Sequence, residues 1–154
     1  MLPNIHLTLG AIYSYVLFLL FPEIGVLGFL IIFFSSFLID IDHYIYYVFK
    51  KKNLHPIRAI KWFFKNRDIL SSYSKQERRE FYTGLYFLHG IEILLVLILL
   101  VFVSEYFLYV LIGFGFHIFL DLIETLSSKN RLSKISIIND FLNSKKLKHI
   151  EEVK

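Results

Sequence analysis

Cysteine is absent from the 154-residue sequence, and its absence excludes two kinds of structure. The chain can form no disulfide bond and no thiolate metal site. Basic residues are also missing from long parts of the chain, because all 17 Lys and Arg lie within 44–83 and 125–154. The first apolar run therefore has no basic flank, and a turn follows it in place of a small-residue cleavage site, so we expect no cleaved signal peptide.

Apolar residues dominate the rest of the sequence. Hydrophobic residues make up 56% of the chain and the mean hydropathy is +0.57, and both values exceed those of typical soluble proteins. The apolar residues form four runs, at 7–21, 24–39, about 85–103 and 106–120. Each run is somewhat shorter than the roughly 20 residues that cross a bilayer, but adjacent turns and interfacial aromatic residues can extend a helix. We predict an all-α, polytopic membrane protein with a bundle of four transmembrane helices; a very apolar soluble bundle is the alternative.

The links between the runs predict the topology. Short turns at 21–23 and 104–105 pair the first run with the second and the third with the fourth, and a long polar segment follows each pair. Because these two polar segments hold every Lys and Arg, the positive-inside rule places them, and both termini, in the cytoplasm. We predict one membrane-embedded domain, 1–128, with a cytoplasmic insertion at about 44–83, and a polar cytoplasmic tail, 129–154.

The predicted insertion contains two local signals. Ser74 and Glu77 have the spacing of a capping box, which predicts a helix that begins there and continues into the third apolar run. Residues 56–67 mix basic and apolar side chains in the manner of an amphipathic helix on an anionic leaflet. We expect the aromatic side chains of this helix at the interface and its cations on lipid phosphates. The candidate lipid-binding residues are Arg58, Lys61, Trp62 and Lys65.

Ionisable residues gather at the predicted cytoplasmic ends of all four runs. His117 and Asp121 are four residues apart and share one helix face. The pairs His89–Glu92 and Asp40–His43 have i,i+3 spacing, whereas Asp42 points elsewhere unless the helix frays there. Carboxylate–histidine pairs that project inward from helices commonly build dinuclear sites, and this ligand chemistry suits Zn²⁺, Mn²⁺ or Fe²⁺. The candidate metal ligands are His6, Asp40, Asp42, His43, His89, His117 and Asp121.

Each of these residues also has a structural interpretation that needs no metal. Asp42 has the residue type and position of an N-cap for the helix that follows it. His6 is in a position typical of an interfacial polar group, and His89 or His117 would serve equally to satisfy a hydrogen bond inside a bundle. His55 and His149 lie in polar segments, where we expect them to be solvated.

Four short motifs resemble a known family. They are an N-terminal His6, LIDIDH at 38–43, LHG at 88–90 and FHIFLD at 116–121. The pattern resembles the prokaryotic inner-membrane metal-dependent hydrolases, which include the LexA-regulated membrane hydrolase of enteric bacteria. That family is grouped at a distance with zinc-dependent phospholipase C and single-strand-specific zinc nucleases. The resemblance implies that the metal ligands or their neighbours are His6, Asp40, Asp42, His89, His117 and Asp121.

One departure from the family lies just before the third motif. Family members often carry a His-Arg pair and a Thr there, whereas TGLYFLHG at 83–90 has neither the His nor the Arg, and Thr83 is displaced. A ligand or substrate contact of the family is therefore expected to be missing in this chain.

These observations lead to a functional hypothesis. We expect a hydrolase at the cytoplasmic membrane face that holds one or two divalent ions, most simply zinc, and acts on an anionic phosphoester such as a phospholipid head group. Asp42 or Glu92 is the expected general base. Membrane lipids are the expected partners, and no nucleic acid is expected. The alternatives are a metal-ion or proton transporter, a b-type haem protein and a non-catalytic scaffold whose helices are clamped by metal.

Overall fold

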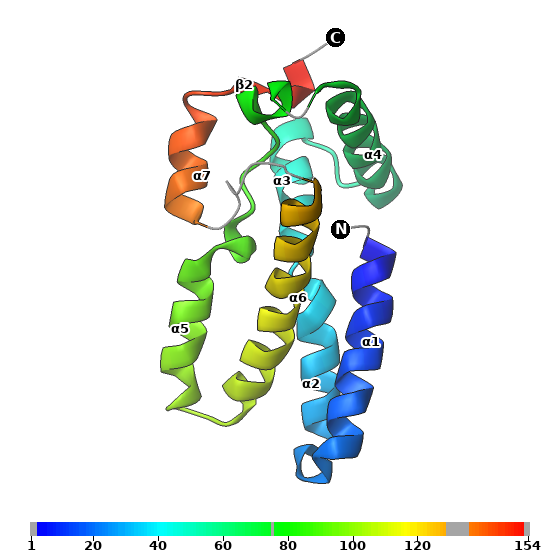
Figure 1. The fold of residues 1–154 in the computed structure, drawn as a ribbon, viewed down its shortest axis with the longest axis vertical. Coiled ribbons are helices and arrows are strands. Elements are labelled where there is room, and N and C mark those ends of the chain that lie inside the picture. The colour runs from blue at the N-terminus through cyan, green and yellow to red at the C-terminus, as the bar shows by residue number, and fades with distance from the viewer. Residues whose placement is uncertain (1–2, 75, 129–135, 153–154) are drawn as a thin grey trace. The chain divides into compact units, whose positions relative to one another are not determined.

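The computed structural model describes residues 3–74, 76–128 and 136–152, and it confirms a mostly helical fold (Figure 1). The chain forms two compact units. Unit 1 comprises residues 1–40 and 91–124, and unit 2 comprises residues 41–90 and 125–154. The predicted domain 1–128 therefore contributes residues to both units.

Unit 1 is built from apolar helices. It contains α1 (Pro3–Leu20), the short 3-10 helix η1 (Pro22–Ile24), α2 (Gly25–Leu38), α5 (Ile91–Val101) and most of α6 (Tyr106–Ser128). Pro22 begins η1 at the predicted turn, so α1 and α2 form an antiparallel pair (Figure 1). The ring of Tyr13 on α1 stacks on Phe116 of α6 with centroids 3.9 Å apart.

One glycine allows α6 to approach α2 closely. A Cβ atom at Gly113 would lie 2.4 Å from the carbonyl oxygen of Ile32, which is shorter than any real contact of this kind. A residue with a side chain would therefore force the two backbones apart. The close approach lies one turn before His117 on α6, and this places His117 beside the last turn of α2.

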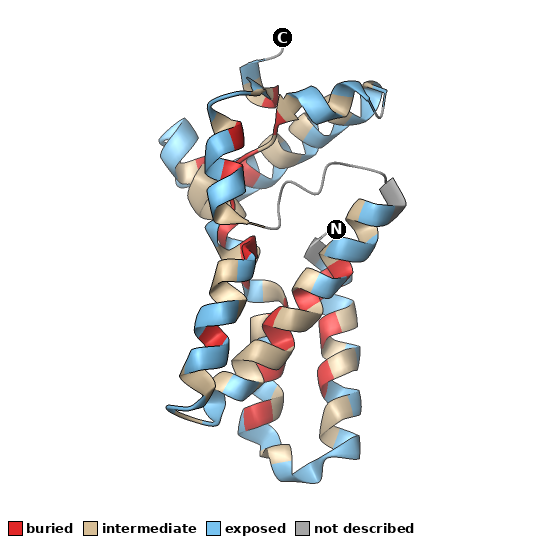
Figure 2. Ribbon diagram, turned by 60° about the vertical axis from the view of Figure 1, so that its left-hand side comes forward, coloured by how far each residue is buried: buried red, intermediate tan, exposed pale blue. Residues whose placement is uncertain are grey.

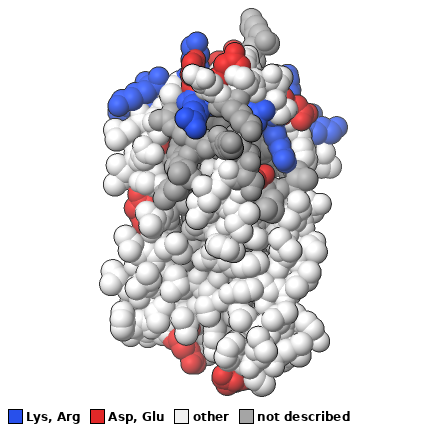
Figure 3. All heavy atoms as spheres, in the orientation of Figure 1, with Lys and Arg blue, Asp and Glu red and all other residues white. Residues whose placement is uncertain are grey.

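Unit 1 leaves much of its apolar surface exposed. Figure 2 shows how few residues of these helices are buried, and Figure 3 shows uncoloured atoms over most of their surface. Two helical stretches are long and apolar enough to cross a membrane: Tyr106–Leu126, and Pro22–Lys51 when η1, α2 and α3 are taken as one helix. Asn4–Leu20 and Ile91–Val101 are shorter apolar helices. The 11 residues of α5 cover about 16 Å of a hydrocarbon core that is about 30 Å thick. The association with a membrane is thus supported by two helices, and the number of spans and the topology stay predictions.

Unit 2 combines the polar middle segment with the C-terminal segment. Its elements are α3 (Ile41–Lys51), α4 (Pro56–Ser72), η2 (Glu77–Glu80), β1 (Phe81–Tyr82), η3 (Phe87–His89), α7 (Ile137–Ser144), β2 (Lys148–His149) and η5 (Ile150–Glu152). β1 and β2 pair in parallel, with Phe81 opposite Lys148. Lys50 on α3 forms an ion pair of 2.5 Å with the buried carboxylate of Glu151. The described part of the predicted tail is therefore packed on the middle segment; residues 129–135 and 153–154 lie outside the described residues.

The capping box forms, but the helix predicted to follow it does not. The Glu77 carboxylate accepts a hydrogen bond of 2.8 Å from the Ser74 amide, as expected; Lys75 between them is not described. The chain then makes only the short helix η2 and turns into β1, because pairing with β2 keeps it extended. Gly84 follows with φ of 146°, a conformation that favours glycine and is incompatible with a helix. The prediction of a continuous helix into the third apolar run was wrong, and α5 begins only at Ile91.

The amphipathic helix is present as α4, but its faces differ from the prediction. Trp62 packs inward against Tyr47, with ring centroids 5.7 Å apart, and is only partly exposed. The exposed apolar residues are instead Ile57, Ile60 and Phe64. Trp62 shares a helix face with the buried Ala59, and its position at a lipid interface stays a prediction. The three cations Arg58, Lys61 and Lys65 are exposed, as expected.

Candidate metal centre

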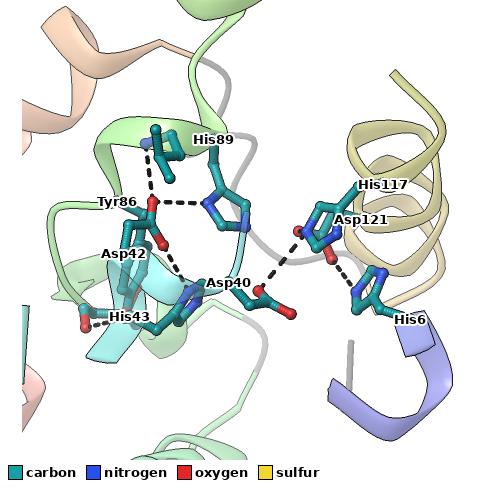
Figure 4. Close-up of polar contacts among 10 residues, drawn as sticks. His6, Asp40, Asp42, His43, Tyr86, His89, His117 and Asp121 are labelled. Atoms are coloured by element: carbon teal, nitrogen blue, oxygen red, sulfur yellow. Dashed lines mark hydrogen bonds and ion pairs between the residues drawn. The ribbon is translucent and has the colours of Figure 1, made fainter. Parts of the chain in front are cut away.

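Four predicted ligands come together within unit 1. His6 lies near the start of α1, Asp40 follows α2, and His117 and Asp121 lie one turn apart on α6 (Figure 4). Nε2 of His117 is 3.5 Å from Oδ2 of Asp121 and 3.7 Å from Oδ1 of Asp40. The i,i+4 pairing of His117 with Asp121 is thus confirmed.

A backbone carbonyl fixes the orientation of His117. Its imidazole is fully buried, and Nδ1–H donates a hydrogen bond of 2.8 Å to the carbonyl oxygen of Ser36. A carbonyl can only accept, so Nδ1 carries the proton and Nε2 carries the lone pair when the ring is neutral. Nε2 is the atom that faces the two carboxylates. This arrangement is the one that metal-binding histidines adopt, with the second ring nitrogen held by the protein.

Among the described residues, only one nitrogen of His6 has a polar partner. Its side chain is 1% exposed, and Nε2 lies 3.2 Å from Oδ1 of Asp121. The ring stacks on His117 with centroids 4.0 Å apart. Nδ1 is buried and has no hydrogen-bond partner among the described residues. Nε2, which faces Asp121, is therefore the nitrogen of His6 that could ligate an ion at this cluster.

The spacings within the cluster match a metal site. Ligands about 2.0–2.2 Å from a tetrahedral zinc ion lie about 3.3–3.6 Å from one another. The three contacts measure 3.2, 3.5 and 3.7 Å. Candidate ligand atoms of His6, Asp40 and His117 all lie within 4.8 Å of one another. The structure therefore supports the coarser prediction that a metal ion can be held by buried His and Asp groups.

The carboxylates of this cluster are partly exposed. Asp40 and Asp121 each have about a quarter of their side chain exposed (23% and 24%), so the cluster is partly open on the side of the carboxylates. No Lys or Arg occurs in the sequence of unit 1. The cluster thus combines two carboxylates with two imidazoles, and every Lys and Arg of the sequence lies outside unit 1.

A second set of predicted residues comes together within unit 2. Asp42 lies in the first turn of α3 and its side chain is fully buried. Oδ1 of Asp42 is 2.9 Å from Nδ1 of His43, and Oδ2 is 3.0 Å from Nδ1 of His89 (Figure 4). Oδ2 also accepts a hydrogen bond of 2.9 Å from the backbone amide of Leu88. Asp42 thus joins two imidazoles that are 46 residues apart in the sequence, and it is not the N-cap that its position suggested.

The loop before α5 is shaped to place His89. Burial raises the pKa of the Tyr86 hydroxyl well above its ordinary value, so the hydroxyl keeps its proton and donates to the carbonyl of Thr83 over 2.9 Å. The His89 amide donates to the carbonyl of Tyr86 over 3.2 Å. Gly84 has no side chain at the point where a Cβ atom would lie 2.7 Å from the Tyr86 hydroxyl. These contacts set the position of His89 relative to Tyr86, whose ring stacks on His43 with centroids 3.9 Å apart.

One spacing prediction was wrong and another stays a prediction. Asp40 and His43 lie on either side of an interruption, because α2 ends at Leu38 and α3 begins at Ile41, so their shared helix face stays a prediction. His89 lies in η3 and is followed by the extended residue Gly90, so it is not on the same helix as Glu92. Glu92 lies in the first turn of α5 in unit 1, and its catalytic role stays a prediction.

Some contributors to the two sets were not foreseen from the sequence. The Ser36 carbonyl and the Leu88 amide are backbone groups, and no residue pattern marks them. Tyr86 precedes His89 by three residues, and this spacing was visible but carried no recognised signal.

No family model matches the chain, and no curated protein or solved structure matches it significantly.

Proposed function

We propose that this protein is a membrane-bound, metal-dependent hydrolase whose divalent ion is held by His6, Asp40, His117 and Asp121. The observation that carries the proposal is the set of donor spacings in unit 1, which agree with the edges of a tetrahedral site. Two imidazoles and two carboxylates without sulfur suit zinc, and also manganese or iron. The resemblance of the motifs around these residues to inner-membrane hydrolases supports the reaction class.

The residues of the cluster have distinct roles in this proposal. When bound, the ion supplies Lewis-acid chemistry, because it activates water as a nucleophile and polarises a phosphoryl or acyl oxygen. The Ser36 carbonyl holds His117 so that Nε2 faces the ion. Asp40 and Asp121 form the more exposed side of the cluster, which is the side open to substrate. Glu92, in the same unit, is the proposed general base, since both oxygens of Asp42 already accept hydrogen bonds.

The proposed substrate is an anionic phosphoester, with the phospholipid head group as the simplest example. The exposed apolar surface of unit 1 supports a position within a bilayer. We propose that α1, α2, α5 and α6 span the inner membrane of a prokaryote, with both termini in the cytoplasm. On α4, the exposed apolar residues Ile57, Ile60 and Phe64 alternate with exposed cations, as expected for a helix on an anionic leaflet.

Turnover of a generic phosphodiester by the purified protein tests this function. Bis(4-nitrophenyl) phosphate with added Zn²⁺ or Mn²⁺ is a suitable substrate, because the assay does not depend on the identity of the lipid. His117→Ala and Asp121→Ala should each abolish metal-dependent turnover, since each removes a ligand. His55→Ala is the matched control, because His55 is exposed at the start of α4. Equal turnover by His55→Ala and His117→Ala, or turnover that chelator does not reduce, would contradict the proposal.

A further inference from the structure

We propose that Asp42 is a positioning residue that holds His43 and His89 as a pair of Nε2 ligands for a divalent transition-metal ion in unit 2. The proposal assigns Asp42 neither to the metal nor to proton transfer. It concerns unit 2 alone, so it stands independently of the hydrolase function proposed for the cluster in unit 1.

The hydrogen bonds of Asp42 determine the protonation of its neighbours. The Leu88 amide can only donate, so Oδ2 of Asp42 is an acceptor in that contact. Two imidazole Nδ1 atoms, one on each oxygen, lie within 3.0 Å of the carboxylate. The hydrogen bond donated by the Leu88 amide favours the ionised form of the carboxylate, as does its place in the first turn of α3. An ionised carboxylate only accepts, so both Nδ1 atoms carry protons.

The consequence is that both rings have the same tautomer. With Nδ1 protonated, each neutral imidazole carries its lone pair on Nε2, which is the reverse of the form that free histidine favours in water. Metal-binding histidines are held in this way, with one nitrogen on the metal and the other donating to a carboxylate or carbonyl. A structural hydrogen bond needs only one imidazole, whereas the buried Asp42 carboxylate holds two imidazoles in the tautomer that binds metal through Nε2.

The surroundings keep the two rings in place. His43 lies between Tyr86, on which it stacks, and Phe63, which meets it edge-on with centroids 5.5 Å apart. The His89 backbone is fixed by the Tyr86 carbonyl, and the neighbouring Leu88 amide is fixed by Asp42 itself. The rings of His43 and His89 meet edge-on with centroids 4.9 Å apart, and one nitrogen of each ring lies within 4.8 Å of a nitrogen of the other.

The tautomers can be measured directly. Long-range ¹H–¹⁵N correlation spectra of the metal-free, full-length protein with ¹⁵N-labelled histidine distinguish protonated from unprotonated ring nitrogens. His43→Gln and His89→Gln, which each remove one set of signals, provide the assignment. Both rings should show protonated Nδ1 and unprotonated Nε2. Addition of Zn²⁺ should then shift both Nε2 signals. A protonated Nε2 on either ring of the metal-free protein would overturn the proposal.

Asp42→Asn tests the role of the carboxylate at nearly constant shape. The amide group of Asn donates hydrogen bonds, so it forces the ring that it contacts to accept at Nδ1 and to carry its proton on Nε2. One of the two Nε2 signals should no longer respond to Zn²⁺, and zinc affinity in unit 2 should fall about 10–100-fold. Asp68→Asn, at an exposed position on α4, is the matched control and should change neither property. Wild-type zinc binding by Asp42→Asn would overturn the proposal.

The same spectra separate this inference from the proposed function. His6 and His117 should respond to Zn²⁺ in the wild type and in Asp42→Asn alike, since both belong to unit 1 and Asp42 belongs to unit 2. Failure of His6 and His117 to respond would refute the site in unit 1. Failure of His43 and His89 alone would refute the role of Asp42.

Discussion

Gly113→Ala should weaken metal binding through the packing of α6 on α2. The added Cβ atom would lie 2.4 Å from the Ile32 carbonyl oxygen, whereas real contacts of this kind begin near 3.0 Å and are usually longer than 3.4 Å. The helices must therefore separate locally by about 0.6–1.0 Å. The same displacement would stretch the 2.8 Å hydrogen bond from His117 to Ser36 to about 3.4–3.8 Å, beyond the useful range.

Two opposing effects determine the stability of this variant. Replacing Gly by Ala in a helix contributes about 0.5–1 kcal/mol in favour of folding. Overpacking typically costs about 1–3 kcal/mol. The steric cost is the larger, because one of the two atoms in the way is the Ile32 carbonyl oxygen, a backbone atom that cannot rotate aside; the other is the Ser35 hydroxyl. We expect a net loss of about 1 kcal/mol of stability and a loss of about 10–100-fold in zinc affinity, as when a group that orients a ligand is removed.

Gly115→Ala is the matched control for this prediction. It lies on the same helix, and a Cβ atom there would meet no atom within 4 Å. This variant should be as stable as the wild type or slightly more stable, and it should bind zinc normally. Zinc affinity from competition with a chromogenic chelator, and thermal unfolding in the same detergent, provide the two measurements. Wild-type zinc affinity in Gly113→Ala would refute the claim that the approach of α6 to α2 positions His117.

Two further predictions concern the membrane. Lys51→Cys should be protected from a membrane-impermeant thiol reagent in intact cells and Glu23→Cys should be labelled; the reverse result would invert the proposed topology. Reversal of the three exposed cations of α4 (Arg58, Lys61 and Lys65) to Glu should remove about 3 kcal/mol of attraction to an anionic leaflet, since each juxtamembrane cation contributes about 1 kcal/mol. Activity on anionic lipid vesicles should then fall roughly 100-fold, with little change on a soluble phosphodiester; equal losses on both substrates would assign α4 to the fold or the chemistry.

Helical periodicity predicted the local part of the site. The four-residue spacing of His117 and Asp121 was sufficient, because both residues lie within one uninterrupted helix. The interruption between α2 and α3 at residues 39–40 was not predicted, because neither residue is a proline or a glycine. As a result, Asp40 belongs to unit 1 and Asp42 to unit 2, although only one residue separates them.

Long-range contacts could not be predicted in this way. The hydrogen bond from His117 to Ser36 joins residues 81 positions apart, and that from His89 to Asp42 joins residues 47 apart. Such contacts depend on tertiary packing, which a single sequence does not encode in any local pattern. The face of α4 is a different case. Trp62 and the buried Ala59 are three residues apart, so helical spacing alone would have placed Trp62 on the inner side.

The metal content of the purified protein tests the central claim most directly. Protein purified without any chelator should contain one or two divalent ions per chain. X-ray absorption should show only nitrogen and oxygen ligands at about 2.0–2.2 Å from the ion. Removal of the metal should lower thermal stability, and its return at 100 times the dissociation constant should restore about 2.7 kcal/mol. Protein that contains no metal, and that neither Zn²⁺ nor Mn²⁺ stabilises against heat, would show that His6, Asp40, His117 and Asp121 are polar packing and not a metal centre.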